Sequence, residues 1–209
     1  MSTIAWHDEA IKRRIEELIH EVESKSSAEI VVTVKPRSGD YRSADLTFAA
    51  IMALVGLCIY VYAPIEFTDD LAPPSIAVMF FAAFACSTRV PMIRRWFAPK
   101  ALRASNTRAA ARETFVDQNI ACTRDRSGIL IYVSTFEQQA HVVPDIGILR
   151  RENDGNLLRL TYAVECAITQ NKPIEAFEVA VRELGQWLAD NLPPRFDDTN
   201  ELSNEVHVS

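Results

Sequence analysis

Glycine and cysteine are both scarce in this chain. Six glycines occur among 209 residues, and no Walker loop, GxGxxG or GxSxG motif is present. The sequence therefore offers no glycine-rich phosphate cradle and no nucleophile elbow. The four cysteines show no CxxC or Cys/His ligand spacing, so we expect neither a disulfide framework nor an organic-cofactor or zinc motif built on them. They are Cys58, Cys86, Cys122 and Cys166.

A basic field is absent as well. The formal net charge is -6, so we expect no nucleic-acid partner. The first 20 residues are charged and amphipathic without an apolar h-region, and we expect no secretory signal peptide. The four histidines form no ligand spacing, and His141 falls in a strand-like segment, where a packed or edge position is commoner than a catalytic one.

Two long apolar runs stand out against this background. LTFAAIMALVGLCIYVYAPI (Leu46–Ile65) and LAPPSIAVMFFAAFACST (Leu71–Thr88) contain no charged residue between their ends. Roughly 20 apolar residues cross a bilayer, so the runs predict a transmembrane hairpin at 45–96, with spans at about 46–65 and 72–90. The alternative is a pair of buried helices in a soluble core, but a helix that is apolar all round needs a large protein or lipid about it.

The charges beside these runs predict an orientation. The linker between them holds only acidic charges, Glu66, Asp69 and Asp70. Under the positive-inside rule we expect both termini in the cytoplasm and a two-span protein of the inner membrane, with the lipid bilayer as its first partner. The basic residues after the second run either anchor this orientation or bind anionic lipid heads. The basic flanks are Lys35, Arg37 and Arg42 before the runs and Arg89, Arg94, Arg95, Lys100 and Arg103 after them.

The remaining segments alternate between helical and strand patterns. They predict one α/β domain made of residues 1–44 and 97–194, followed by an acidic flexible tail at 195–209. The expected strands are 28–36, 128–134 and 140–144. The expected helices are 4–24, 99–120, 154–169 and 174–191.

The predicted topology gathers three carboxylates. A helix joins the first two strands, which predicts a parallel pair, and a short turn predicts an antiparallel third strand. Glu29, Asp125 and Asp145 would then share one sheet edge on the side away from the membrane. Oxygen ligands of this kind suit Ca²⁺ or Mg²⁺. Solvated strand ends, with a salt bridge to Arg124 or Arg126, are the alternative that stays open.

A family resemblance lies in the same segments. TRDRSGILIYVSTFEQQAHVVPDIGI (Thr123–Ile148) resembles the central signature of the TPM domain: a TR-x-GILI-type strand, a polar turn with a Glu, and a strand ending in Asp-x-Gly-Ile. SSAEIVVTV resembles the first strand of that domain. FEVAVRELGQWLADNLPP and DDTNEL are similar to the closing helix and tail of membrane-bound members. The resemblance covers nearly the whole soluble part.

The TPM family is named from a thylakoid lumen protein, a photosystem II repair protein and a nicotinic-receptor auxiliary protein. The resemblance implies a three-layer α/β/α sandwich with a small mixed sheet, here interrupted by the two-helix transmembrane hairpin. Members are described as acid phosphatases, calcium-binding proteins or membrane accessory proteins. Glu29 and Asp145 match family positions, whereas Asp125 falls in a variable stretch. Many members carry a signal peptide and work outside the cytoplasm, and this chain departs from that pattern.

Two functions follow as hypotheses. The first is a binding or accessory module for membrane-protein complexes, dependent on a divalent cation, because no nucleophile–base pair is evident in the sequence. The second is a weak metal-assisted phosphatase acting on phosphomonoesters, with Glu29 and Asp145 as ligands or acid/base groups. Fold-level likeness alone establishes no reaction, which favours the first.

Overall fold

The computed structural model describes Trp6, residues 8–62, 72–151, 155–169 and 173–194, Leu202 and residues 206–208. The chain divides into two units. One is Gly39–Arg103, and the other joins Met1–Ser38 to Ala104–Ser209. The segment 45–96 that was predicted as a hairpin lies within the smaller unit.

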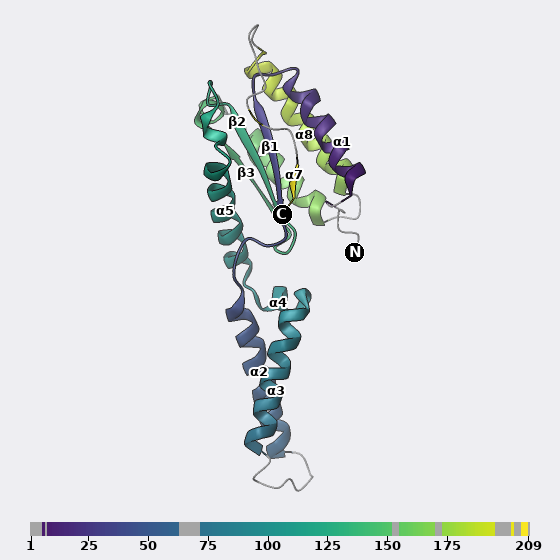
Figure 1. Ribbon diagram of the computed structural model, residues 1–209, viewed down its shortest axis with the longest axis vertical. Helices are drawn as coiled ribbons and strands as arrows, with labels where there is room; N and C mark the ends of the chain where they lie inside the picture. The colour runs from purple at the N-terminus through teal and green to yellow at the C-terminus, as the bar shows by residue number, and fades with distance from the viewer. Residues whose placement is uncertain are drawn as a thin grey trace. The chain divides into compact units, whose positions relative to one another are not determined.

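The larger unit is a mixed α/β domain with a small mixed sheet (Figure 1). Strand bounds match the predicted segments to within a residue, whereas the first helix begins at Glu9, where Asp8 accepts a hydrogen bond from the Ala10 amide. Its elements are α1 (Glu9–Glu23), β1 (Glu29–Lys35), α5 (Lys100–Asp117, which begins in the smaller unit), η2 (Ile120–Cys122), β2 (Gly128–Ser134), β3 (Gln139–Pro144), α6 (Ile146–Leu149), α7 (Asn156–Thr169), α8 (Pro173–Asn191) and β4 (His207–Val208).

The strand order is β3-β2-β1-β4. β1 and β2 are parallel, with Glu29 opposite Gly128, and β2 and β3 are antiparallel. Both pairings were predicted. The predicted flexible tail is wrong at residues 206–208, because β4 pairs with the open edge of β1 and Val206 is buried in the apolar core. A strand edge with unpaired backbone groups readily accepts such a short partner.

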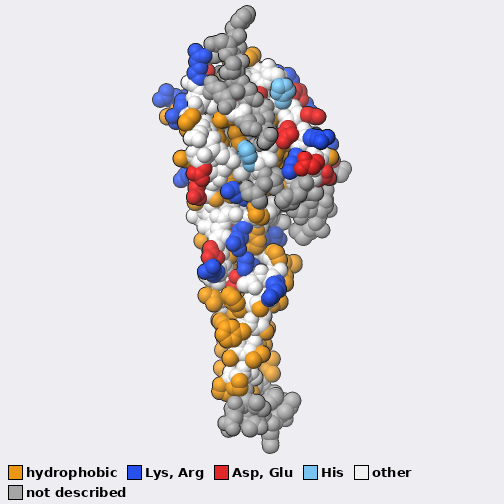
Figure 2. All heavy atoms as spheres, viewed as in Figure 1, with side chains coloured by type: hydrophobic (Ala, Val, Ile, Leu, Met, Phe, Trp, Pro, Cys, Tyr) orange, Lys and Arg blue, Asp and Glu red, His pale blue; other side chains and the backbone are white. Residues whose placement is uncertain are grey.

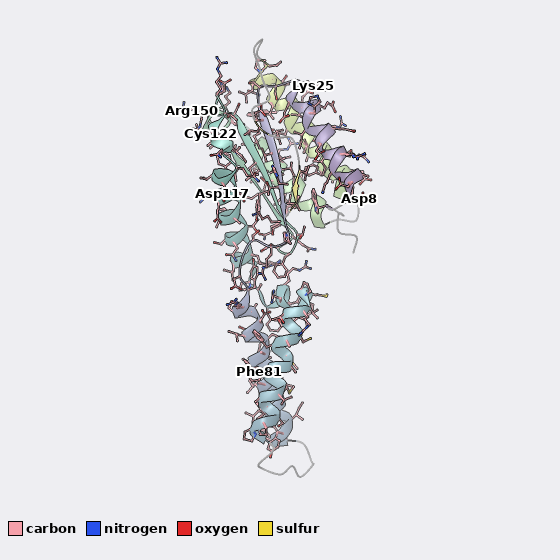
Figure 3. All side chains as sticks on the ribbon, in the orientation of Figure 1. Asp8, Lys25, Phe81, Asp117, Cys122 and Arg150 are labelled. Carbon is pink, nitrogen blue, oxygen red and sulfur yellow. The ribbon has the colours of Figure 1, made fainter. Side chains whose placement is uncertain are left out.

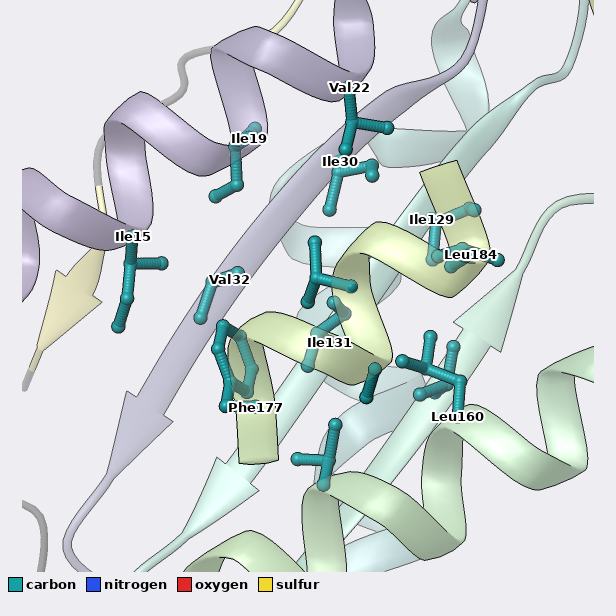
Figure 4. Packing of buried hydrophobic residues seen from close by; sticks show 14 of the residues in the cluster. Ile15, Ile19, Val22, Ile30, Val32, Ile129, Ile131, Leu160, Phe177 and Leu184 are labelled. Atoms are coloured by element: carbon teal, nitrogen blue, oxygen red, sulfur yellow. The ribbon is translucent and has the colours of Figure 1, made fainter. Parts of the chain in front are cut away.

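Apolar side chains cover both faces of the sheet. On one face, alternate residues of β1 and β2 point at α1, α7 and α8, and Phe177 of α8 lies among them (Figure 4). On the other face, Leu130 and Tyr132 pack against Ala111 of α5. Strands buried on both faces read as continuous apolar runs rather than alternating ones, which is why GILIYVS in β2 is buried at every position.

The smaller unit contains α2 (Arg42–Tyr62), α3 (Ala72–Arg89) and α4 (Pro91–Phe97). α2 and α3 are antiparallel, since Gly56 lies against Met79 while Asp45, near the start of α2, reaches Ser87, near the end of α3. Ala49 and Ala83 are also buried. Small residues on facing sides allow two helix backbones to approach closely, as they do in membrane helix pairs.

One helix of the described residues, α2, is by itself long and apolar enough to cross a membrane. α3 meets the same criterion only together with α4, from which it is bent by 103°, so the count is one, or two if the bent pair is one span. The prediction of two membrane spans is therefore supported for α2 and not confirmed for the second span. The acidic linker residues Glu66, Asp69 and Asp70 lie outside the described residues.

Candidate functional site

The start of β1, the start of β2 and the end of β3 lie at one edge of the sheet, which we call the acidic strand edge. Glu29 is the register partner of Gly128, and Ile129 is the partner of Pro144. The amide of Asp145 donates to the carbonyl oxygen of Gly128 over 2.8 Å. The backbones of the predicted site therefore converge as the predicted topology required.

Asp145 is the best-defined side chain of this edge. It is 4% exposed and is the N-cap of α6, where its carboxylate accepts a hydrogen bond from the Ile146 amide at 2.7 Å. The Arg126 guanidinium meets the same carboxylate with Nε–Oδ2 and Nη2–Oδ1 distances of 2.8 and 3.0 Å. A capped and paired carboxylate of this kind orders both the helix start and the loop that carries its cation.

The loop before β2 is fixed by backbone contacts with α6. Arg126 has a φ of 56°, and its carbonyl oxygen accepts from the Gly147 amide over 2.9 Å. A Cβ on Gly147 would lie 2.5 Å from the carbonyl oxygens of both Asp125 and Arg126. Glycine is therefore the residue that lets this loop and α6 meet.

The three predicted metal ligands do not form a metal centre in this arrangement. Glu29 is buried at the first position of β1, Asp125 is half-buried in the loop, and Asp145 is committed to Arg126. Among the residues that the structure describes, no three His, Cys, Asp or Glu side chains are grouped so that they could hold a metal ion. The arrangement matches the predicted salt-bridge alternative for Asp145, and binding of Ca²⁺ or Mg²⁺ remains a prediction from the sequence.

A second charged cluster lies in the smaller unit and was missed by sequence reasoning. Asp45 is fully buried, and its carboxylate accepts from Arg94 Nε at 2.9 Å, Arg94 Nη2 at 2.7 Å and Ser87 Oγ at 2.7 Å. We call these three residues the hairpin lock, because they tie α2, α3 and α4 together. The sequence signal was a lone Asp directly before the first apolar run. Its partner in the structure, Arg94, was predicted only as one of the basic residues that anchor the orientation or bind lipid heads.

A third polar group was also missed. Glu137, 1% exposed, accepts from the Ser38 amide at 2.8 Å and from the Ser134 hydroxyl, while Ser38 Oγ lies 3.0 Å from Tyr132 Oη. These bonds tie the segment after β1 to the β2–β3 turn. The sequence signal was the Glu of the polar turn, three residues after Ser134 at the end of β2, and the satisfied bonds indicate a structural role.

His141 lies on the edge strand β3, on the α5 side, since it is two residues from Val143, which packs against that layer. Burial, together with the positive charges of Arg108 and Arg112, lowers the pKa of His141 below its ordinary value of 6.5. The packed or edge position was predicted.

We expect this lowered pKa to shape the pH dependence of stability. The folded protein holds His141 neutral where the unfolded chain takes up a proton, so stability should be complete above about pH 6.5 and fall as the pH drops below it. His141→Gln should reduce that fall in thermal melts of the purified protein between neutral and mildly acidic pH. His20→Gln, at an exposed site on α1, is the matched control. An equal slope in both variants would contradict the assignment.

Comparison with known proteins adds a fold likeness. No family model matches this sequence, and no curated protein matches it. The chain is similar to the NMR structure of BA42 protein from the psychrophilic bacterium Bizionia argentinensis, with a TM-score of 0.61, 16% sequence identity and coverage of 100% of both chains. At that identity the likeness shows a shared fold and nothing about activity.

Proposed function

We propose that this protein is an integral membrane protein of the inner membrane, anchored by α2 and α3 as a two-span hairpin, with a cytoplasmic TPM-like domain of three α/β/α layers. The observation that carries the proposal is the exposure of the apolar helix α2, of whose most apolar segment 17% is buried. Large apolar side chains, among them Leu54, Ile59 and Val61 of α2 and Val78 and Phe81 of α3, are exposed. Lipid is the environment that such a surface fits.

The surface of the smaller unit supports this proposal. Hydrophobic side chains run along α2 and α3, whereas Lys and Arg gather at the end where α4 lies (Figures 1 and 2). Phe81 lies about midway along α3 (Figure 3). An apolar band that ends in a basic collar is the pattern of a membrane hairpin whose collar faces the cytoplasm.

Native cysteines provide the test of anchorage and orientation. We expect the chain to stay in the membrane pellet after alkaline carbonate washing. A membrane-impermeant maleimide should label exposed Cys122 in inside-out vesicles and leave it unlabelled in intact spheroplasts. Cys58 and Cys86, which lie in α2 and α3, should be labelled far more slowly on either side. Cys122→Ser is the control. Release by carbonate would overturn the anchor, and labelling of Cys122 in spheroplasts would overturn the orientation.

For the cytoplasmic domain we propose a role as a binding or accessory module for membrane-protein complexes. The acidic strand edge supports a binding role, because Asp145 orders the loop of Arg126, whose side chain is 54% exposed and available to a partner. Dependence on a divalent cation is supported by the sequence alone, because the described side chains at this edge are not arranged to hold a metal ion.

We expect Asp145→Asn to weaken association with membrane partners by about tenfold, the equivalent of roughly 1.4 kcal/mol, because Asn keeps the helix cap but releases Arg126. The measurement is quantitative affinity capture of the full chain from detergent-solubilised membranes, beside Asp117→Asn at an exposed site on α5. Partner recovery that is unchanged by Asp145→Asn would rule out this edge as the binding surface.

The wild-type protein and Asp145→Asn also distinguish a binding module from the second hypothesis, which is a phosphatase. If the domain is a weak metal-assisted phosphatase, hydrolysis of a chromogenic phosphomonoester with Ca²⁺ or Mg²⁺ should be measurable and should fall with Asp145→Asn. The buried position of Glu29 next to the β2 start is the one feature that favours it. Calorimetric titration of Ca²⁺ and Mg²⁺ into both proteins tests the predicted cation site directly.

A further inference from the structure

The sequence between α3 and α4 dictates a sharp bend. Pro91 is the first residue of α4, and the residue before a proline is disfavoured in the helical conformation. Val90 is accordingly extended, with a φ of -109° and a ψ of 96°. α4 leaves α3 at an angle of 103°. With α3 crossing the membrane, such a bend directs α4 nearly parallel to the membrane surface.

The inner side of α4 is fixed to the other two helices of the smaller unit. Phe97 meets Phe48 of α2 edge to face, with 5.2 Å between the ring centres. Arg94, three residues before Phe97 and therefore on the same side of the helix, pairs with Asp45 in the hairpin lock, which also includes Ser87 of α3. An aromatic contact and a buried ion pair together define which side of α4 faces outward.

The outer side of α4 carries Met92 and Trp96, which are 59% and 78% exposed. They are four residues apart, so their side chains are neighbours on one face of the helix. Tryptophan is highly buried on average in folded proteins, and a large exposed apolar patch marks a surface that binds something. Tryptophan is also enriched where a membrane meets water, because its ring is apolar and its N–H is polar.

The surroundings of this outer side fit lipid. The unit that contains α4 already exposes the apolar side chains of α2 and α3, so a bilayer around those helices would reach α4 as well. The described residues of Gly39–Arg103 carry six Lys and Arg against two carboxylates, a charge complementary to an anionic membrane surface. Exposed Arg89 and Lys100 flank α4 directly. Interfacial helices combine apolar side chains at the acyl boundary with cations among the headgroups.

We infer that α4 is an interfacial helix that lies in the cytoplasmic leaflet, with Met92 and Trp96 inserted about 5–10 Å into the boundary of headgroups and acyl chains. The second span is then α3 alone, whose 18 residues fall within the range of about 17–25 that crosses a bilayer. The inference rests on the proposed membrane anchor. It goes beyond that anchor because it gives α4 a lipid-binding surface of its own and ends the second span at Arg89.

Trp96 is its own probe of depth. The fluorescence difference between the wild-type protein and Trp96→Phe separates its signal from those of Trp6 and Trp187. The full chain is reconstituted into liposomes whose phospholipids carry bromine either high on the acyl chains or near the chain ends. We expect shallow bromine to remove most of the difference signal, and deep bromine or aqueous iodide to remove little. The matched marker is Phe81→Trp in the Trp96→Phe background, at an exposed site midway along α3 (Figure 3), which deep bromine should quench best.

Each other outcome has a distinct meaning. Stronger quenching of Trp96 by deep bromine would overturn the inference, because α4 would then continue the span of α3. Quenching by iodide alone would place α4 in water, and quenching by none of the three would indicate a protein contact at Trp96. Both results overturn the inference and leave the anchor standing, provided that Phe81→Trp still reports deep lipid. If Phe81→Trp also escapes both brominated lipids, the membrane anchor itself is wrong.

Discussion

Asp45→Ala should destabilise the protein by about 3–5 kcal/mol, because it leaves the Arg94 guanidinium buried without its counter-charge. Arg94 is 15% exposed in its side chain and forms both of its hydrogen bonds to Asp45 with good geometry. We expect a melting temperature about 10 °C lower in detergent micelles, measured by circular dichroism.

The double variant Asp45→Leu, Arg94→Met shows which physical term is responsible. Removal of both charges from a buried pair is often close to neutral, so this variant should regain most of the lost stability. Asp40→Ala is the control, since Asp40 and Arg42 form an exposed pair at 3.4 Å, and such pairs contribute about 0–1 kcal/mol. If the single variant Asp45→Ala melted like the wild type, the hairpin lock would have no energetic role.

Gly147→Ala should cost about 3 kcal/mol and disorder the acidic strand edge. The added Cβ meets two carbonyl oxygens at 2.5 Å, and both belong to backbone, so the loop or α6 must move. Equilibrium unfolding in denaturant measures the loss. Amide hydrogen exchange provides a second measurement. The N–H of residue 147, which donates to the Arg126 carbonyl oxygen in the wild type, should exchange faster in the variant because the loop has shifted.

Gly155→Ala separates steric conflict from backbone strain. Gly155 has a φ of 68° and open space around its Cβ position, so alanine there pays only for the left-handed conformation, about 1–2 kcal/mol. A cost at Gly147 no larger than the cost at Gly155 would contradict the close approach of the loop and α6.

The strands were the most predictable part of the fold. Short β-branched runs such as EIVVTVK and GILIYVS define their own bounds, and the joining helix and turn fix the directions of their neighbours. The same logic correctly placed Glu29 and Asp145 at one edge. It could not decide between a cation site and an ion pair, because that choice depends on where Arg126 points, and a left-handed φ at an Arg has no sequence signature.

Interactions between distant segments were out of reach of pattern reasoning. Asp45 and Arg94 are 49 residues apart, and each alone looks like an ordinary flanking charge. The β4 pairing was missed for a similar reason: a two-residue strand in an acidic tail has no periodicity, and what holds it is the open edge of β1 and the burial of Val206.

The parallel pairing of β1 with β2 has a consequence for biosynthesis. Their register partners Glu29 and Gly128 are separated by the whole smaller unit. At translation rates of about 5–20 residues per second, β1 leaves the ribosome roughly 5–20 s before its central partner exists. During that interval the apolar helices α2 and α3 leave the ribosome first, ahead of α5 and β2. Under the proposed membrane anchor, delivery to the insertion machinery would therefore begin on an unfinished domain, and the sheet would close only after the chain is tethered to the bilayer.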